Sequence, residues 1–236
     1  MHRDLLDALR CPQDHAESWL VAMVHRADGT RLLEADLACP VCGAEFRVEN
    51  GVGIFGAPSV MPSAASSTAS DITSTAQDAP DVARLAAQLG VLGGLTPVLL
   101  AGRYAAVADA YAALTGAPVV VVSTTTIAGN TFTEPGVSVL QIGTRLPLGL
   151  GTLAAAAFDP AMFPATLQAM RPPSLAAGIV RAVRAGGRLV TPATSALPPD
   201  TIATVRTVAR DDTEWVGEVT VTTGGLVTLR RQPPET

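Results

Sequence analysis

The sequence predicts an α/β protein with a mostly parallel sheet, preceded by a small metal-binding domain. A short apolar run, Val98–Ala101, ends at Gly102, and an Ala-rich helical pattern and a second apolar run, Val119–Ser123, follow it. Strand, tight turn, helix and strand in this order open a doubly wound α/β sheet. Two Cys-Pro turns in the first 56 residues predict the metal site. A Ser/Thr/Ala/Pro-rich stretch, 57–80, is predicted to be a flexible linker between the two parts.

Composition narrows the class of protein. Of the 236 residues 48% are hydrophobic but only 4% are aromatic, so the core must be built mainly from Ala, Val and Leu. The formal net charge is −5, and no segment has the basic excess that binding to a nucleic-acid backbone needs. No apolar run reaches the ~18 residues of a membrane span, and no apolar segment opens the chain. We therefore expect a cytoplasmic protein that binds neither membrane nor nucleic acid.

The cysteines predict a zinc site. The chain has three, Cys11, Cys39 and Cys42, and an odd number without a secretion signal argues against a disulfide framework. Cys39 and Cys42 have the C-x-x-C spacing of a metal-binding turn. A tetrahedral zinc site needs four ligands, and three thiolates with His15 would supply them. Asp14, which occupies the C-x-x-C spacing after Cys11, is the competing fourth ligand.

The segments Leu5–Pro12 and Leu37–Phe55 carry a resemblance to a known family. Together they resemble the zinc-ribbon family of tRNA-methyltransferase activator subunits, a ribbon that also occurs fused ahead of bacterial methyltransferase domains. The resemblance implies a zinc ribbon over residues 1–56 and a structural metal. It also implies that Asp14 and His15 replace the second cysteine of the first turn. An alternating strand pattern after Cys42 disfavours a redox role for the Cys39/Cys42 pair, and His25 is interpreted as an ordinary strand residue.

Residues 81–236 are predicted to form five strands alternating with helices, and then an antiparallel hairpin. After the two strands already named, further strands are expected at Val137–Ile142, within Leu153–Phe158 and from Arg188. Helices are expected from Asp81 to Gly90, over Tyr104–Leu114, in the short stretch Ala165–Met170, from Pro173 or Ser174 to Arg184, and from Asp200 to about Ala209. The hairpin is expected to pair Glu214–Thr222 with Leu226–Arg231.

This order resembles the Rossmann-like methyltransferases that use S-adenosylmethionine. The local matches are Ala177–Val190, which is similar to a helix, a Gly-Gly turn and the fifth strand of that family, and Arg145–Leu148 followed by Ala157–Asp159. The resemblance implies a seven-stranded sheet whose last two strands form a reversed hairpin.

The cofactor signature of that family is missing. The resemblance implies an acid and then Gly-x-Gly-x-Gly after the first strand, where this chain has Leu100, Gly102, Tyr104 and Ala106. Ser123 and Thr124 stand where an acid would bind the ribose hydroxyls, and Ile142 stands at a third acid position. If a S-adenosylmethionine-like ligand binds, Gly102, Tyr104 and Ser123 are its expected contacts, but we expect no such binding. The missing Gly-rich loop also argues against a nucleotide or NAD site.

Other catalytic signals are also absent. The chain has no lysine, and no histidine follows His25, so a Schiff-base lysine and a histidine general base in residues 81–236 are excluded. Asp159 is interpreted as a turn or cap residue and Arg103 as a lone surface arginine. No catalytic residue is assigned. The favoured hypothesis is a zinc-binding, non-catalytic protein acting as an interaction, scaffold or regulatory module, with a protein partner or a homo-oligomer. The alternative is an active methyltransferase with a divergent cofactor loop.

Overall fold

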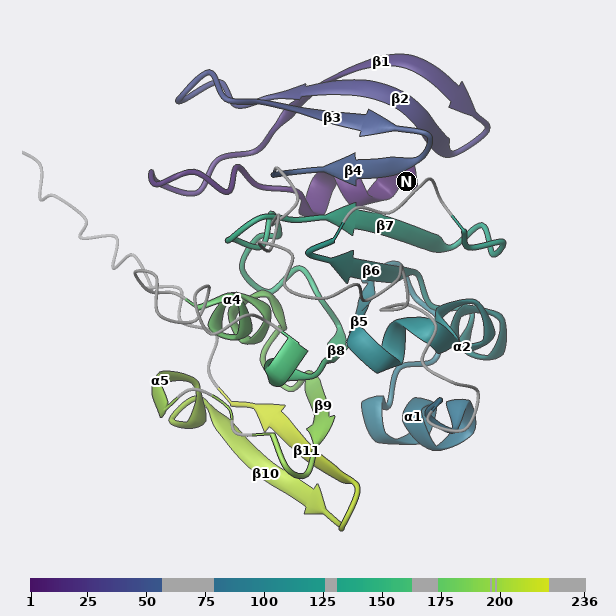
Figure 1. Ribbon diagram of the computed structural model, residues 1–236, viewed down its shortest axis with the longest axis vertical. Helices are drawn as coiled ribbons and strands as arrows, with labels where there is room; N and C mark the ends of the chain where they lie inside the picture. The colour runs from purple at the N-terminus through teal and green to yellow at the C-terminus, as the bar shows by residue number, and fades with distance from the viewer. Residues whose placement is uncertain (57–78, 126–130, 163–173, 196, 198, 221–236) are drawn as a thin grey trace, which may run out of the picture.

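The computed structural model describes residues 1–56, 79–125, 131–162, 174–195, 197 and 199–220. One eleven-stranded sheet runs through it in the order β1-β2-β3-β4-β7-β6-β5-β8-β9-β11-β10 (Figure 1). The predicted linker lies almost entirely outside the described residues, as do Ala165–Met170 and Leu226–Arg231. The domain boundary therefore stays a prediction.

The seven strands from β7 to β10 have the arrangement of a Rossmann-like methyltransferase. β7, β6, β5, β8 and β9 are parallel, and β11 lies antiparallel between β9 and β10. Numbered along the chain from β5, the order is third, second, first, fourth, fifth, seventh, sixth. The strands are β5 (Val98–Ala101), β6 (Val119–Ser123), β7 (Val137–Gln141), β8 (Ala155–Ala157), β9 (Arg188–Pro192), β10 (Val205–Arg210) and β11 (Glu214–Val219). The predicted fold class is confirmed.

Helices cover both faces of this sheet (Figure 1). α1 (Val82–Leu89) starts where the Asp81 carboxylate accepts the Ala83 and Arg84 N–H groups, and it ends at the left-handed Gly90. α1 and α2 (Ala108–Thr115) share one apolar core with β5 and β6. α4 (Leu175–Ala182), capped by Ser174, packs on the other core. Among the described residues the other helices are short: η1 (Arg3–Ala8), η2 (Gly102–Val107), η3 (Pro160–Met162) and α5 (Pro199–Ile202).

The N-terminal segment, residues 1–56, is built into the same sheet. Its strands are β1 (Val21–Asp28), β2 (Arg31–Ala38), β3 (Glu45–Glu49) and β4 (Val52–Ile54). β1 to β4 pair antiparallel, and β4 then pairs in parallel with β7, with Val52 beside Val139. One apolar core contains Leu5, Leu9 and Leu37 of this segment together with Leu99 of β5 and Leu140 of β7. The N-terminal segment and the methyltransferase-like sheet therefore share one core.

The N-terminal segment and the methyltransferase-like sheet come close together at two glycines, Gly56 and Gly143. A Cβ at Gly56, just after β4, would lie 2.8 Å from the backbone of Gly143, just after β7. Real Cβ atoms do not approach backbone this closely, so the two segments can meet there only because Gly56 lacks a side chain, whereas a Cβ at Gly143 would have an ordinary contact at 3.5 Å.

The C-terminal hairpin differs from the prediction. Its first strand is β10, where a helix was expected, and Glu214–Val219 is its second strand. The helix ends at Ile202 because the following segment, Val205–Arg210, is rich in β-branched residues and pairs with β11. Asp211 fixes the turn, since its Oδ1 accepts the backbone N–H groups of Thr213 and Glu214.

Candidate metal centre and cofactor edge

The four predicted zinc ligands lie together. The Sγ atoms of Cys11, Cys39 and Cys42 and a ring nitrogen of His15 are all within 4.8 Å of one another. Cys11 Sγ is 3.7 Å from Cys42 Sγ, and Cys39 Sγ is 3.4 Å from His15 Nε2. Two ligands of a tetrahedral zinc ion at ordinary bond lengths are separated by roughly 3.5–3.8 Å. The donor set and its spacing therefore fit Zn²⁺.

Local hydrogen bonds orient these ligands. His15 Nδ1 lies 2.6 Å from the Ala16 carbonyl oxygen, and a proton donated there leaves Nε2 free as the metal-binding nitrogen. The Cys39 turn is closed by the Gly43 N–H, which donates to the Cys39 carbonyl, and Gly43 has a φ of 71°. This left-handed conformation explains why glycine follows Cys42.

Asp14 does not belong to the cluster of ligand atoms. Its side chain is 81% exposed and its Oδ1 lies 3.4 Å from Arg145 Nη2. Between the two candidates for the fourth ligand, the geometry favours His15.

The surroundings shift the pKa values of the Cys11 and Cys39 thiols in opposite directions. Burial raises the pKa of the Cys11 thiol to about 12. Burial also acts to raise the pKa of Cys39, but hydrogen bonds from the backbone N–H groups of Cys42 and Val41 outweigh it and lower that pKa to about 6. Thiolates are the form that binds metal, so the backbone hydrogen bonds of its turn favour the coordinating form of Cys39.

The cofactor edge is the edge of the sheet formed by the carboxyl ends of β5, β6, β7 and β8. Gly102 follows β5 with a φ of 65°, which matches the first glycine of the expected turn. Leu100 and Ile142, at two of the positions where an acid was expected, are completely buried. Ser123 ends β6, is buried, and uses its Oγ in its own turn, where it accepts the Thr125 N–H at 3.1 Å.

Tyr104 is completely buried on the α1–α2 side of the sheet. Its hydroxyl is 3.3 Å from Glu214 Oε1 and accepts a hydrogen bond from Arg103 Nη2 at 3.0 Å. The Arg103 guanidinium also lies 4.9 Å from the centroid of the tyrosine ring. The side chain thus packs into the core, with its polar end satisfied by Glu214 and Arg103.

Glu214 is the centre of a polar cluster that the sequence did not predict. It receives Arg103 Nη2 at 3.3 Å, Arg84 Nε at 3.4 Å and Gln88 Nε2 at 2.8 Å. The interpretation of Arg103 as a lone surface arginine was therefore wrong. No local signal could have found this pair, because Glu214 lies 111 residues further along the chain.

Asp159 has the predicted cap role. Its Oδ1 accepts the Ala161 N–H at 2.9 Å at the start of η3, and it accepts the Ser195 hydroxyl at 2.7 Å. His25 is a strand residue of β1, as predicted, and its Nε2 pairs with Asp36 at 2.8 Å.

Comparison with known proteins shows no family for this chain. No family model and no curated protein matches the chain. Solved methyltransferase structures do. A geranyl diphosphate C-methyltransferase from Streptomyces coelicolor A3(2) is 19% identical over 47% of this chain and 43% of its own, with a TM-score of 0.36. The antibiotic-resistance methyltransferase Kmr is 16% identical over 62% of this chain and 94% of its own, with a TM-score of 0.38.

A third structure, the MycE methyltransferase from the mycinamycin biosynthetic pathway, is 10% identical over 65% of this chain and 53% of its own, with a TM-score of 0.41. The chain spans less than half the length of the geranyl diphosphate enzyme. The strand order therefore carries the assignment, and the chain has a Rossmann-like, methyltransferase-type fold joined to a candidate Cys/His metal site. Among the described residues, no helix has the length and apolar character that crossing a membrane requires.

Proposed function

We propose that this chain is a zinc-stabilised interaction module whose methyltransferase-like part does not transfer methyl groups. The observation that carries the proposal is the burial of Tyr104 with its hydroxyl on Glu214. In the methyltransferases that the sequence resembles, this turn is kept open by glycines so that the cofactor can approach the backbone. Here a large side chain and an ionic cluster fix the turn to the C-terminal hairpin.

The other cofactor positions support the same conclusion. Leu100 and Ile142 stand at two other expected acid positions, and as buried apolar residues they offer the cofactor no side-chain hydrogen-bond acceptor. The Ser123 hydroxyl, at the position of the ribose-binding acid, already accepts a hydrogen bond from the Thr125 N–H. Each missing contact to the cofactor would cost on the order of 1–3 kcal/mol, so their joint absence disfavours binding.

The metal contributes stability in this proposal. The four side chains that gather there would close the coordination sphere of a zinc ion, which is the pattern of a structural zinc site. Cys11, Cys39 and Leu9 belong to the core shared with the parallel strands. Zinc binding would therefore hold the N-terminal strands against the sheet.

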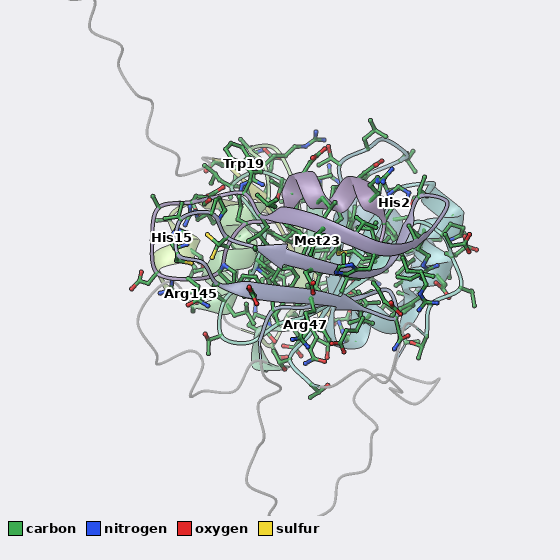
Figure 2. All side chains as sticks on the ribbon, turned by 90° about the horizontal axis from the view of Figure 1, so that it is seen from above. His2, His15, Trp19, Met23, Arg47 and Arg145 are labelled. Atoms are coloured by element: carbon green, nitrogen blue, oxygen red, sulfur yellow. The ribbon has the colours of Figure 1, made fainter. Side chains whose placement is uncertain are left out.

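An exposed apolar row supports the interaction role. Trp19, Val21 and Met23 are 65%, 63% and 60% exposed. They alternate along the edge strand β1 and the segment just before it. Figure 2, which looks onto the N-terminal strands from outside, shows Trp19 and Met23 on this side. Exposed apolar residues on an unpaired edge strand are a common mark of a protein interface. The partner expected there is another protein or a second copy of the chain.

Calorimetric titration with S-adenosylmethionine and S-adenosylhomocysteine tests the non-catalytic role. We expect no saturable heat with either compound. Clear micromolar binding would overturn the proposal and support the alternative, an active methyltransferase with a divergent cofactor loop.

Sedimentation of the wild type and of Met23→Ser tests the interface. If the partner is a second copy, Met23→Ser reduces the self-association of the wild type. Leu114→Ser, which changes an equally exposed residue on α2, serves as the control and should leave it unchanged.

A further inference from the structure

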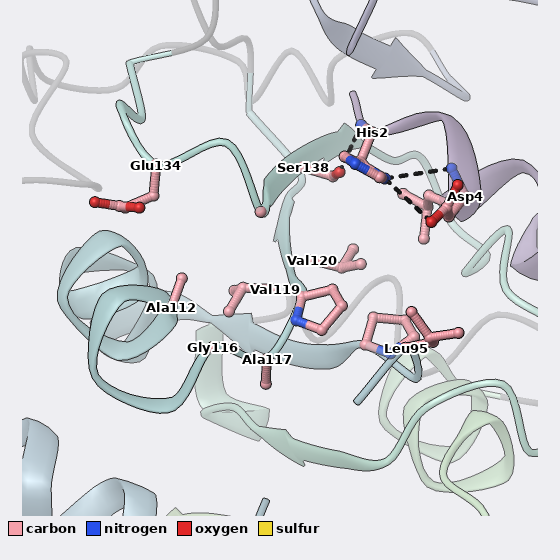
Figure 3. Close-up of a pocket in the computed structure, with 14 residues that line it drawn as sticks. His2, Asp4, Leu95, Ala112, Gly116, Ala117, Val119, Val120, Glu134 and Ser138 are labelled. Atoms are coloured by element: carbon pink, nitrogen blue, oxygen red, sulfur yellow. Dashed lines mark hydrogen bonds and ion pairs between the residues drawn. The ribbon is translucent and has the colours of Figure 1, made fainter. Parts of the chain in front are cut away.

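A cavity of about 300 Å³ lies at the amino-terminal edge of the parallel strands, on the side opposite the cofactor edge. The starts of β6 and β7, the C-terminal end of α2, the segment before β5 and the N-terminal residues around η1 all line it (Figure 3). It is therefore bounded by both the N-terminal segment and the methyltransferase-like sheet. Neither the metal centre nor the proposed interface includes it.

The walls of the cavity are apolar and offer few free backbone groups. Leu95, Pro97, Pro118 and Val119 contribute to them. The prolines have no N–H, and their carbonyls accept the N–H groups of Ala154 and Val98, each at 2.8 Å. The Val119 N–H donates to the Gly136 carbonyl. With these backbone donors used or absent, an anion would find little to bind in these walls.

The charged groups around the cavity are acidic. Glu134 lines it, and its side chain has no hydrogen bond or ion pair with any other residue that the structure describes. The one bond from Glu134 to Asp109 is made by the Glu134 backbone N–H. Asp4 contributes a second carboxylate, which lies 3.8 Å from His2 Nδ1. Among the described residues that line the cavity there is no arginine. In Figure 3, Glu134 lies on one side of the opening and His2 with Asp4 on the other.

Two hydrogen bonds hold His2 in place, one from its backbone N–H and one to its side chain. Its N–H donates to Ser138 Oγ at 2.9 Å, and its Nδ1 accepts the Asp4 N–H. The N-terminal residues are thus tied to β7, and Asp4 is kept at the rim. Apolar walls with carboxylates at the opening complement a molecule that has an apolar body and a positive end.

We propose that this cavity binds a small organic amine, with its hydrocarbon part against Leu95 and Val119 and its ammonium group at Glu134. The ammonium supplies N–H donors to the Glu134 carboxylate, which has no partner among the described residues. This site is independent of the proposed loss of methyl transfer, since it lies at the other edge of the sheet.

Three probes of one shape test the proposal: phenethylamine, 2-phenylethanol and phenylacetate, titrated into the full-length protein and followed by nuclear magnetic resonance. We expect phenethylamine to bind with shifts centred on residues around Val119 and Glu134. It should bind roughly fivefold more tightly than the alcohol, the size expected of one partly exposed ion pair, and the acid should bind least. Added salt should reduce the preference for the amine.

Two variants, Glu134→Gln and Leu95→Ala, and one control, Glu45→Gln, separate the effect of charge from that of shape. Glu134→Gln keeps the shape of the side chain and should bring the affinity for the amine down to that for the alcohol. Glu45→Gln, which removes an exposed carboxylate on β3, should change neither. Leu95→Ala should weaken both the amine and the alcohol. Equal binding of the three probes, no binding of the amine at millimolar concentration, or an unchanged amine affinity in Glu134→Gln would each overturn the proposal.

Discussion

The Tyr104 hydroxyl lies 3.3 Å from Glu214 Oε1, so the first turn of the parallel sheet is joined directly to the C-terminal hairpin. Tyr104 follows β5 and Glu214 opens β11. The contact replaces an open turn with a packed one. Its energetic weight can be measured by removing one hydroxyl.

Tyr104→Phe should lower the free energy of unfolding by about 1–2 kcal/mol, because the Glu214 carboxylate and Arg103 lose a buried partner. Tyr111→Phe is the matched control. Its hydroxyl is buried and has no hydrogen-bond partner among the described residues, so its removal should be neutral or stabilising. Urea denaturation of both variants checks the pair, and equal losses would refute a specific role for the Tyr104 hydroxyl.

Alkaline titration should show that neither tyrosine ionises in the folded protein near the ordinary pKa of about 10. The chain has only these two tyrosines. Burial raises the pKa of Tyr111 to about 12 and that of Tyr104 further. Because the fold favours the neutral phenols, their contribution to stability is complete below the unfolded pKa of about 10 and is lost as the pH rises above it.

Ultraviolet absorbance of tyrosinate, followed together with circular dichroism, measures this behaviour. Both tyrosines should ionise with the loss of structure. A smooth ionisation near pH 10 in protein that stays folded would contradict the burial of both rings.

Protein purified without added zinc should contain one zinc ion per chain, bound by Cys11, His15, Cys39 and Cys42. Cys39→Ser should lower the affinity by roughly 100-fold, if about 12 kcal/mol of binding free energy is shared among four ligands. His15→Ala should have a similar effect, whereas Asp14→Asn should keep the metal, because Asp14 pairs with Arg145. Metal analysis and competition with a chromophoric chelator give the affinities. Retention of zinc by His15→Ala with loss in Asp14→Asn would reverse the assignment of the fourth ligand.

Gly56→Ala should destabilise the protein by about 1–3 kcal/mol, since the new methyl group meets the Gly143 backbone and one chain must move. Gly136→Ala is the control, because a Cβ there has only ordinary contacts at 4.0 Å. Thermal unfolding compares them. A Gly56→Ala protein as stable as Gly136→Ala would show that β4 and β7 do not meet as described.

Local signals in the sequence predicted much of the fold. Asp81 and Gly90 mark the two ends of α1, and the run from Val119 to Ser123 is a buried strand in every residue. The spacing of the cysteines predicted which side chains gather at the candidate metal centre. In each case the information lies within one element or one turn, which is why residue patterns could reveal it.

Contacts between distant segments were not predictable in this way. Arg103 gives no local sign of its partner Glu214, and nothing in Val52–Ile54 indicates a parallel neighbour in β7. The hairpin was misplaced because Val205–Arg210 has both apolar residues and arginines at helical spacing, while pairing with β11 decides its structure. The choice between His15 and Asp14 likewise depended on Arg145, far away in the sequence.

The parallel pairing of β4 with β7 has a consequence for synthesis on the ribosome. Val52 is translated well before its ladder partner Val139, and β5 and β6 lie between them in the chain. The segment that carries the three cysteines can therefore capture a metal ion while the β7-facing edge of β4 still has no neighbour. Docking onto β7 must be a late step with long loop closure, and it is the stage at which the nascent chain is most exposed to wrong strand pairing.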